Sequence, residues 1–312
     1  MNWLPVAIAA YFLLAISNLV DKFLVEKVLG SARAYTFVAC TLGALVFLVA
    51  PWFLSWPGIS GLLLDLLLGG IFSIALLLLY ASLRRGEASR ALVIIGGSTP
   101  IFTLPLSLLV LGDRIPTGEL AAIAFLIAGV TVVALLPVNR PGFWSKIIGQ
   151  RTQKTSSLFS IMLALGSGLA YSLFFVGSKF AYQEQPFVSA FLWTRLGALL
   201  AASCILFFPQ ARKEIKSLFV RKPSRKRNQG LVVGNQIIGS LGFVLQNYAV
   251  FLGPVALVNA LQGVQYAWII ILGAVVTAIW PNILKEDIGW RALIQKGVAI
   301  VLISVGLYLL SI

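Results

Sequence analysis

The sequence has no histidine, only two cysteines and few charged residues. The absence of histidine excludes histidine-based metal sites, catalytic triads and proton relays, so any proton coupling must use carboxylates. Cys40 and Cys204 both lie in apolar runs, which is typical of small buried hydrophobic residues. No phosphate-binding loop of the G-x-x-x-x-G-K-[ST] type occurs. The sequence therefore predicts no cofactor, no metal and no direct use of ATP.

Charged residues make up 11% of the chain and hydrophobic residues 59%. Soluble domains carry about a quarter charged residues, so this composition excludes that class. A membrane-spanning helix needs roughly 20 mainly apolar residues. We read the first apolar run as a retained helix, because no basic residue precedes it. Ten spans are predicted, over residues 4–28, 34–56, 60–83, 88–111, 118–137, 157–182, 187–208, 230–252, 254–280 and 290–311.

The second five segments repeat the residue order of the first five. Other segment pairs match at offsets of 157, 167 and 168, and one insertion in the basic tract explains the change. Because five is odd, the second copy would start from the opposite face of the membrane, as in carriers with inverted repeats. The clearest match, at an offset of 154, joins Phe37, Thr41, Gly43, Ala44 and Leu45 to Phe191, Arg195, Gly197, Ala198 and Leu199.

The predicted fold is therefore an all-α integral membrane protein with ten transmembrane helices in two inverted five-helix repeats. The first repeat covers residues 1–137, a basic linker covers 138–156, and the second repeat covers 157–312 with a basic loop at 209–229. The length, the five-plus-five duplication, the acidic turns after segments four and nine, and the glycine-spaced last helix of each half resemble the drug/metabolite transporter superfamily, of the ten-helix EamA type. The resemblance covers the whole chain and implies a transporter. Such proteins often carry an arginine in the second helix of a repeat. Arg195 stands at this place in the second half, whereas the first half has Thr41 there and departs from the pattern.

The net charge of +14 comes from loops rather than from a nucleic-acid-binding surface. All but three of the 24 Lys and Arg residues, the exceptions being Arg114, Lys179 and Arg195, fall in or beside connections one, three, five, seven and nine. Because such loops stay in the cytoplasm, the charges predict that both termini lie outside, in a prokaryotic cell membrane. The resemblance implies termini inside, and the sequence leaves these two orientations open.

Polar side chains at membrane depth either pair with neighbouring helices or line an aqueous cavity. Helical spacing groups them into stripes that we expect to face inward. One stripe joins Gln236, Ser240 and Asn247 on segment eight, and another joins Asn259, Gln262 and Tyr266 on segment nine. Arg195 lies deep in segment seven and needs an anionic or carbonyl partner, either a substrate or the backbone. Asp65, near a membrane edge, is a carboxylate that could titrate with transport. The candidate substrate-binding residues are Asn18, Tyr171, Lys179, Arg195, Gln236, Ser240, Asn247, Asn259, Gln262 and Tyr266.

Segments four and nine are the candidate gate. Pro100 and Pro105 each remove a backbone hydrogen bond, so we expect kinks in segment four. Gly96 and Gly263 occupy matching places in the two segments and allow close packing or bending.

The sequence predicts a secondary transporter that moves a small polar or zwitterionic metabolite by alternating access. The partners expected are that substrate, the lipid bilayer and a coupling ion, with no nucleic acid. Two alternatives are an intramembrane lipid-handling protein and a non-transporting membrane subunit. An enzyme is not expected, because no nucleophile with a base can be identified at membrane depth.

Overall fold

The computed structural model describes residues 2–24, 31–85, 88–112, 117–134, 158–219, 223–279 and short pieces between 294 and 309. In these ranges the regular elements are helical. Five of them are long and apolar enough to cross a membrane. In chain order the elements are α1 (Trp3–Leu24), α2 (Ala32–Gly43), η2 (Ala44–Val49), α3 (Ala50–Phe53), α4 (Gly58–Arg85), α5 (Ala88–Val110), α6 (Thr117–Ala134), α8 (Leu158–Glu184), α9 (Phe187–Ser203), η3 (Cys204–Phe207), α10 (Pro209–Phe219), α11 (Pro223–Leu252), α12 (Val255–Ala260) and α13 (Gln262–Ile279).

The predicted segments agree closely with these helices. Every predicted segment except the tenth has a helical counterpart in the described ranges. Most of segment ten, residues 290–311, lies outside the described residues. The helical, membrane-spanning character of the chain is therefore confirmed, whereas the inverted ten-helix repeat stays a prediction.

The basic tract at 209–229 differs from the loop that we predicted. It contains α10, and α11 begins at Pro223, seven residues before the predicted start. Ala211 and Ile215 of α10 are buried, while Arg212, Lys213 and Lys216 are exposed. Apolar residues four apart lie on one face of a helix, so α10 can cover the end of the bundle with its cations facing out. The tract was predicted as a loop because it contains no apolar run of the kind from which the other helices were predicted.

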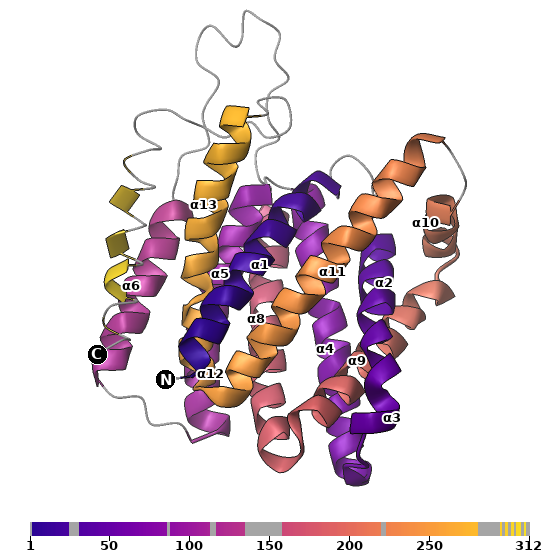
Figure 1. Ribbon diagram of the computed structural model, residues 1–312, viewed down its shortest axis with the longest axis horizontal. Coiled ribbons are helices and arrows are strands. Elements are labelled where there is room, and N and C mark those ends of the chain that lie inside the picture. The colour runs from indigo at the N-terminus through magenta and orange to yellow at the C-terminus, as the bar shows by residue number, and fades with distance from the viewer. Residues whose placement is uncertain are drawn as a thin grey trace, which may run out of the picture.

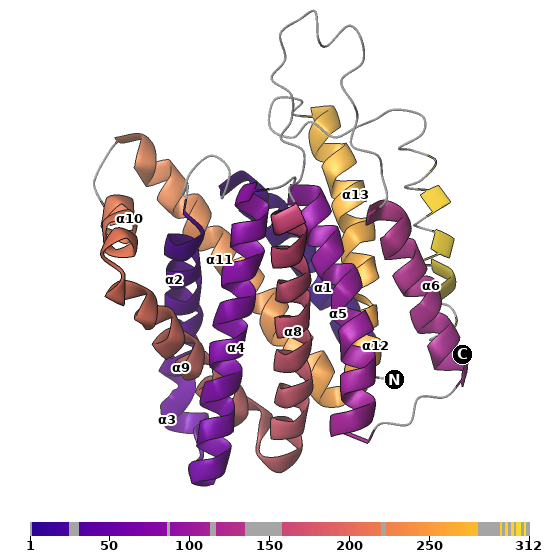
Figure 2. The same cartoon turned by 180° about the vertical axis from the view of Figure 1, so that it is seen from behind.

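The helices form a bundle whose chain passes back and forth between two ends (Figures 1 and 2). At one end, Ser82 donates to the backbone oxygen of Ser160, which joins α4 to α8. At the other end, Ser55 N–H donates to the hydroxyl oxygen of Ser189, which joins the turn after α3 to α9. We call the first the Ser82 end and the second the Ser55 end. The odd-numbered basic connections all leave the described helices at the Ser82 end (Figure 1).

Four helix pairs make the most extensive contacts: α1 with α11, α4 with α8, α4 with α9, and α5 with α8. α1 packs along α11, and α4 packs along α8, to a similar extent. Glycines allow this closeness: a Cβ on Gly242 of α11 would lie 3.0 Å from Leu14, and one on Gly239 would lie 2.6 Å from the Ser17 hydroxyl. α4 also packs along α9, whereas α2 contacts α11 only slightly.

Large apolar side chains face outward near both ends of the bundle. Trp52 and Trp56 are 76% and 66% exposed at the Ser55 end, and Phe207 is 79% exposed after α9. Aromatic residues concentrate at the two membrane–water interfaces of membrane proteins. The outer surface is therefore suited to lipid.

Segments four and nine differ in continuity. α5 runs as one helix through Pro100 and Pro105. Segment nine is instead interrupted at Leu261, between α12 and α13, where the Val264 N–H bonds the Leu261 oxygen in a tightened turn. The interruption therefore falls where no proline stands, and no helix break marks Pro100 or Pro105.

Candidate functional site

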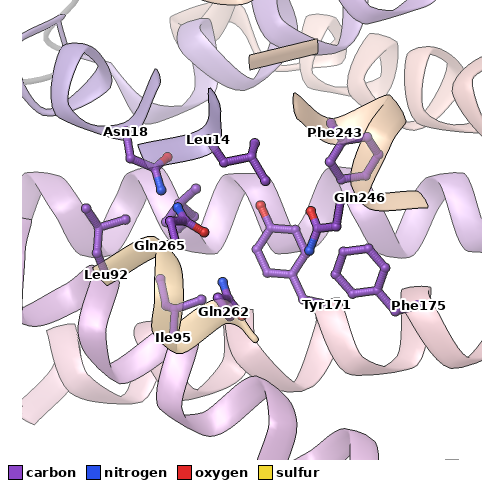
Figure 3. Close-up of a pocket in the computed structure, with 11 residues that line it drawn as sticks. Leu14, Asn18, Leu92, Ile95, Tyr171, Phe175, Phe243, Gln246, Gln262 and Gln265 are labelled. Carbon is purple, nitrogen blue, oxygen red and sulfur yellow. The ribbon is translucent and has the colours of Figure 1, made fainter. Parts of the chain in front are cut away.

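A cavity of about 80 Å³ lies between the two halves of the chain. Its walls come from the first, third and fourth segments and from the sixth, eighth and ninth (Figure 3). Such a volume holds a few water molecules, each of which takes roughly 30 Å³ in the liquid. A metabolite would need the walls to move apart, because ligand pockets usually measure roughly 300–1,000 Å³. The lining residues are Leu14, Asn18, Leu79, Leu92, Ile95, Tyr171, Phe175, Phe243, Gln246, Gln262 and Gln265.

Four primary amides and one phenol supply the polar groups of the cavity. Asn18 comes from α1, Gln246 from α11, and Gln262 and Gln265 from α13. Figure 3 shows these amides around a common space, with the Tyr171 ring beside Gln246. Amides offer both donors and acceptors without a net charge. The cavity can therefore bind a small polar molecule through hydrogen bonds.

Helix packing explains why Gln246 and Asn18 meet there. The two glycines of α11 that touch α1 are spaced so that Gln246 follows Gly242 by four residues, on the same face. Gln246 also donates to the Tyr11 hydroxyl at 3.3 Å, and that hydroxyl donates to the Val258 oxygen at 2.7 Å. This chain of bonds ties α11, α1 and α12 together at one side of the cavity.

Arg195 is buried but does not line the cavity. Its guanidinium carbon lies 4.1 Å from the ring centre of Phe72, 4.6 Å from Phe243 and 5.0 Å from Phe191. Phe243 is shared, since it also forms part of the cavity wall. The Nε and Nη2 atoms are buried without a hydrogen-bond partner in the described part of the chain. The guanidinium thus packs against aromatic rings, and the Phe243 ring contacts both it and the cavity.

Three of the predicted substrate-binding residues line the cavity: Asn18, Tyr171 and Gln262. Ser240 is half-buried and outside the lining set, and the Tyr266 side chain lies outside the described residues. The other predicted polar residues make interhelical contacts instead. Gln236 donates to Tyr35, Asn247 accepts from Tyr182, Asn259 donates to Thr103, and Lys179 donates to the backbone oxygens of Phe251 and Gly253.

The predicted gate residues lie on the helices that we expected. Pro100 and Gly96 are buried in α5, and Pro105 is exposed. Gly263 is buried in the first turn of α13, next to the interruption at Leu261. Their role as a gate stays a prediction.

The sequence analysis missed Gln246 and Gln265. Gln265 follows Gln262 by three residues and so shares its face, a signal that was available. Gln246 shares a face with Gly242 and Gly239, and this glycine stripe marks the side of α11 that approaches another helix. In the predicted stripe, Gln236 bonds Tyr35 of α2 and Asn247 bonds Tyr182 of α8, rather than α1.

Comparisons with known proteins agree with this architecture. The model of the EamA-like transporter family matches residues 1–135. The fold matches 26 chains of solved structures. One, described as "Crystal structure of protein", aligns with 99% of this chain and 96% of its own, with a TM-score of 0.64 at 17% sequence identity, and so shares the fold. No curated protein matches the sequence. Residues 1–135 are thus similar to the EamA-like transporter family of the drug/metabolite transporter superfamily, and the long apolar helices are those of a multi-pass membrane protein.

Proposed function

We propose that the protein is a secondary transporter that moves a small polar or zwitterionic metabolite by alternating access of its amide-lined cavity to the two sides of the membrane. The observation that carries the proposal is the position of this cavity between the two halves of the chain. Carriers with inverted repeats bind their substrates at the interface of the repeats, near the middle of the bilayer.

Related positions of the two halves support this view. Leu14 and Tyr171 both line the cavity and stand 157 residues apart, the offset that relates segments one and six. Ile95 and Gln262 both line it at 167, the offset that relates segments four and nine. A cavity on the axis of a two-fold repeat is lined in this way. The family match also ends at residue 135, next to the predicted boundary at 137.

Unequal packing of related helices supports alternating access. Segments three and seven, α4 and α9, correspond to segments eight and two, α11 and α2, in the proposed repeat. α4 and α9 pack closely: a Cβ added to Gly197 would lie 2.6 Å from the Leu66 Cα. By contrast, a Cβ added to Gly43 of α2 or to Gly234 of α11 would meet nothing within 4 Å. Gly43 and Gly234 are the counterparts of Gly197 and Leu66 at offsets of 154 and 168. We infer that the second pair closes when the first opens.

For sidedness, we propose that the Ser82 end faces the cytoplasm. The odd-numbered connections, which carry most of the Lys and Arg residues, leave the described helices at this end. Loops rich in these residues stay cytoplasmic.

Flux through purified protein in liposomes tests the function. We expect labelled polar or zwitterionic metabolites to cross without chemical change. Replacing Gln262 with Leu should lower the flux at least about tenfold, because the site would lose its hydrogen bonds. Gln210→Leu, at an exposed position of α10, is the matched control. Product formation would point to an enzyme, and neither flux nor product to a non-transporting subunit.

A disulfide tests the alternation. We expect Gly43→Cys with Gly234→Cys, with Cys40 and Cys204 replaced by Ala, to form a cross-link in a fraction of the molecules and to stop flux until the bond is reduced. Gly43→Cys with Val233→Cys is the control, because Val233 is exposed on a neighbouring face of α11. If the protein transports but the cysteines at positions 43 and 234 never cross-link, the proposed closure of α2 against α11 is ruled out.

A further inference from the structure

Two buried carboxylates each meet one side-chain amide, at opposite ends of the bundle. Gln185 Nε2 donates to Asp65 Oδ2 at 2.7 Å, in the half of α4 near the Ser55 end. Asn235 Nδ2 donates to Asp21 Oδ1 at 2.7 Å, at the Ser82 end. Asp65 is fully buried and Asp21 is 8% exposed. The two pairs lie in the two most extensive packings, α4 with α8 and α1 with α11.

One oxygen on each group of the Asp65 pair lacks a donor. Asp65 Oδ1 and Gln185 Oε1 are both buried and have no partner in the described residues. The hydrogen bond from the Gln185 amide to Asp65 holds these two oxygens on adjacent groups, where two acceptors repel each other. A proton on Asp65 Oδ1 would turn that oxygen into a donor toward Gln185 Oε1 and satisfy both atoms. The carboxylic acid and the amide would then form two mutual hydrogen bonds.

The Asp21 pair has one such oxygen, on the amide. Asn235 Oδ1 is buried and has no partner among the described residues. Asp21 Oδ1 accepts from both Asn235 and the Tyr35 hydroxyl, so Oδ2 is the oxygen left to carry a proton. A proton there would donate to Asn235 Oδ1 and complete the second bond of the pair.

Among the described residues, the titratable groups that face the carboxylates are neutral tyrosines. Tyr35 of α2, Tyr80 of α4 and Tyr171 of α8 face Asp21, and Tyr182 of α8 faces Asp65. In the described part of the chain no Lys or Arg forms an ion pair with either carboxylate. A buried carboxylate without a cation is costly in a membrane, and binding a proton removes that charge.

We propose that Asp65–Gln185 and Asp21–Asn235 are proton-binding sites, one at each end of the bundle, and that each binds one proton. Their role in transport rests on the function proposed above. In the first site, Asp65 lies on segment three and Gln185 follows segment six. In the second site, Asn235 lies on segment eight, the counterpart of segment three, and Asp21 lies on segment one, the counterpart of segment six. The two sites therefore occupy related helix pairs with the acid and the amide exchanged, and protonation joins each pair of helices.

Infrared spectra of the purified protein in liposomes test proton binding without any substrate. At neutral pH the exposed Asp and Glu side chains are ionised, so a carboxylic-acid C=O band reports buried protonated groups. We expect such a band in the unaltered protein, about half of it in Asp65→Asn or Asp21→Asn, and none in the double variant. Glu184→Gln, which removes an exposed carboxylate on α8, should leave it intact. Asp65→Glu and Asp21→Glu should keep the band.

No band in the unaltered protein, or a band that survives in the double variant, would overturn the proposal. Transport adds a second readout, with a mixture of labelled neutral amino acids as the probe. We expect each Asn variant to keep exchange at equal pH and to lose at least tenfold in uptake driven by a pH gradient. Gradient-driven uptake that persists in both variants would remove the coupling role. Absence of flux in every form would reject the proposed substrate class, while the infrared band would still decide the proton sites.

Discussion

The second helix of each half occupies two very different environments. On α9, Arg195 is buried among aromatic rings and Gly197 touches the backbone of α4. At the related positions of α2, Thr41 is exposed and bonds its own helix at the Phe37 oxygen, and Gly43 has open space around it. The positions correspond in the proposed repeat, but only one of the two helices is closed against its neighbour.

This difference shows which contacts belong to one conformation. The interfaces between the proposed repeats that are equally extensive, α1 with α11 and α4 with α8, are the parts that we expect to stay rigid. The α4–α9 contact and the open α2–α11 side are unequal, so they are the parts that we expect to exchange. A carrier built from two copies can change state by exchanging the arrangements of its halves.

The largest effect is expected from filling the closed contact. In Gly69→Ala, the added Cβ would lie 2.1 Å from the Thr194 oxygen and 2.5 Å from the Ala198 nitrogen. Both atoms are backbone, so α4 and α9 must separate, at a cost of about 1–3 kcal/mol or more in the free energy of unfolding. Thermal unfolding in detergent measures this.

Gly43→Ala is the matched control for that substitution. Its Cβ meets nothing within 4 Å, and the helical backbone there, at φ −62°, suits alanine. The unfolding temperature should stay the same or rise slightly. Equal destabilisation by Gly69→Ala and Gly43→Ala would contradict the unequal packing of the two halves.

Arg195→Met should change stability less than Gly69→Ala does, but it should strongly affect ligand binding. Methionine keeps the length and the aromatic contacts, and it removes a buried cation whose Nε and Nη2 are unpaired. Replacing a buried charge by an apolar group is often neutral or stabilising, so unfolding should change by less than about 1 kcal/mol. The thermal shift caused by carboxylate-bearing metabolites should disappear.

Thr41→Met, at the related exposed position of α2, should leave those ligand-induced shifts unchanged. If Arg195→Met instead lowers the unfolding temperature of the ligand-free protein strongly, the arginine stabilises the fold through its aromatic contacts. Its predicted role in substrate binding would then be wrong.

The sequence sufficed for the spans because the lipid imposes their length and apolarity without reference to the neighbouring helix. It did not suffice for α10, whose few buried residues, Ala211 and Ile215, are separated by cations. The helix becomes visible only through its spacing of four and the surface that it covers.

The site was predicted only in part because spacing shows which residues share a face and not what that face meets. Gln262 and Asn259 were assigned to one stripe, yet Gln262 lines the cavity and Asn259 bonds Thr103. The interruption at Leu261 falls between them and changes their relative direction. Local hydrogen bonding at that turn is not readable from hydropathy.

The smallest effect is expected from the prolines, and it extends the comparison to segments four and nine. If α5 and the interrupted α12–α13 move during transport, Pro100→Ala should restore a backbone hydrogen bond in the buried part of α5, stiffen it and slow flux several-fold more than it lowers expression. Pro105→Ala, on the exposed side of the same helix, should change flux less. Initial rates in liposomes, normalised to inserted protein, measure both. Since Pro100 is buried in α5 and Pro105 is exposed, an unaltered rate in Pro100→Ala would remove α5 from the gate and leave the interruption at Leu261 as the hinge to test.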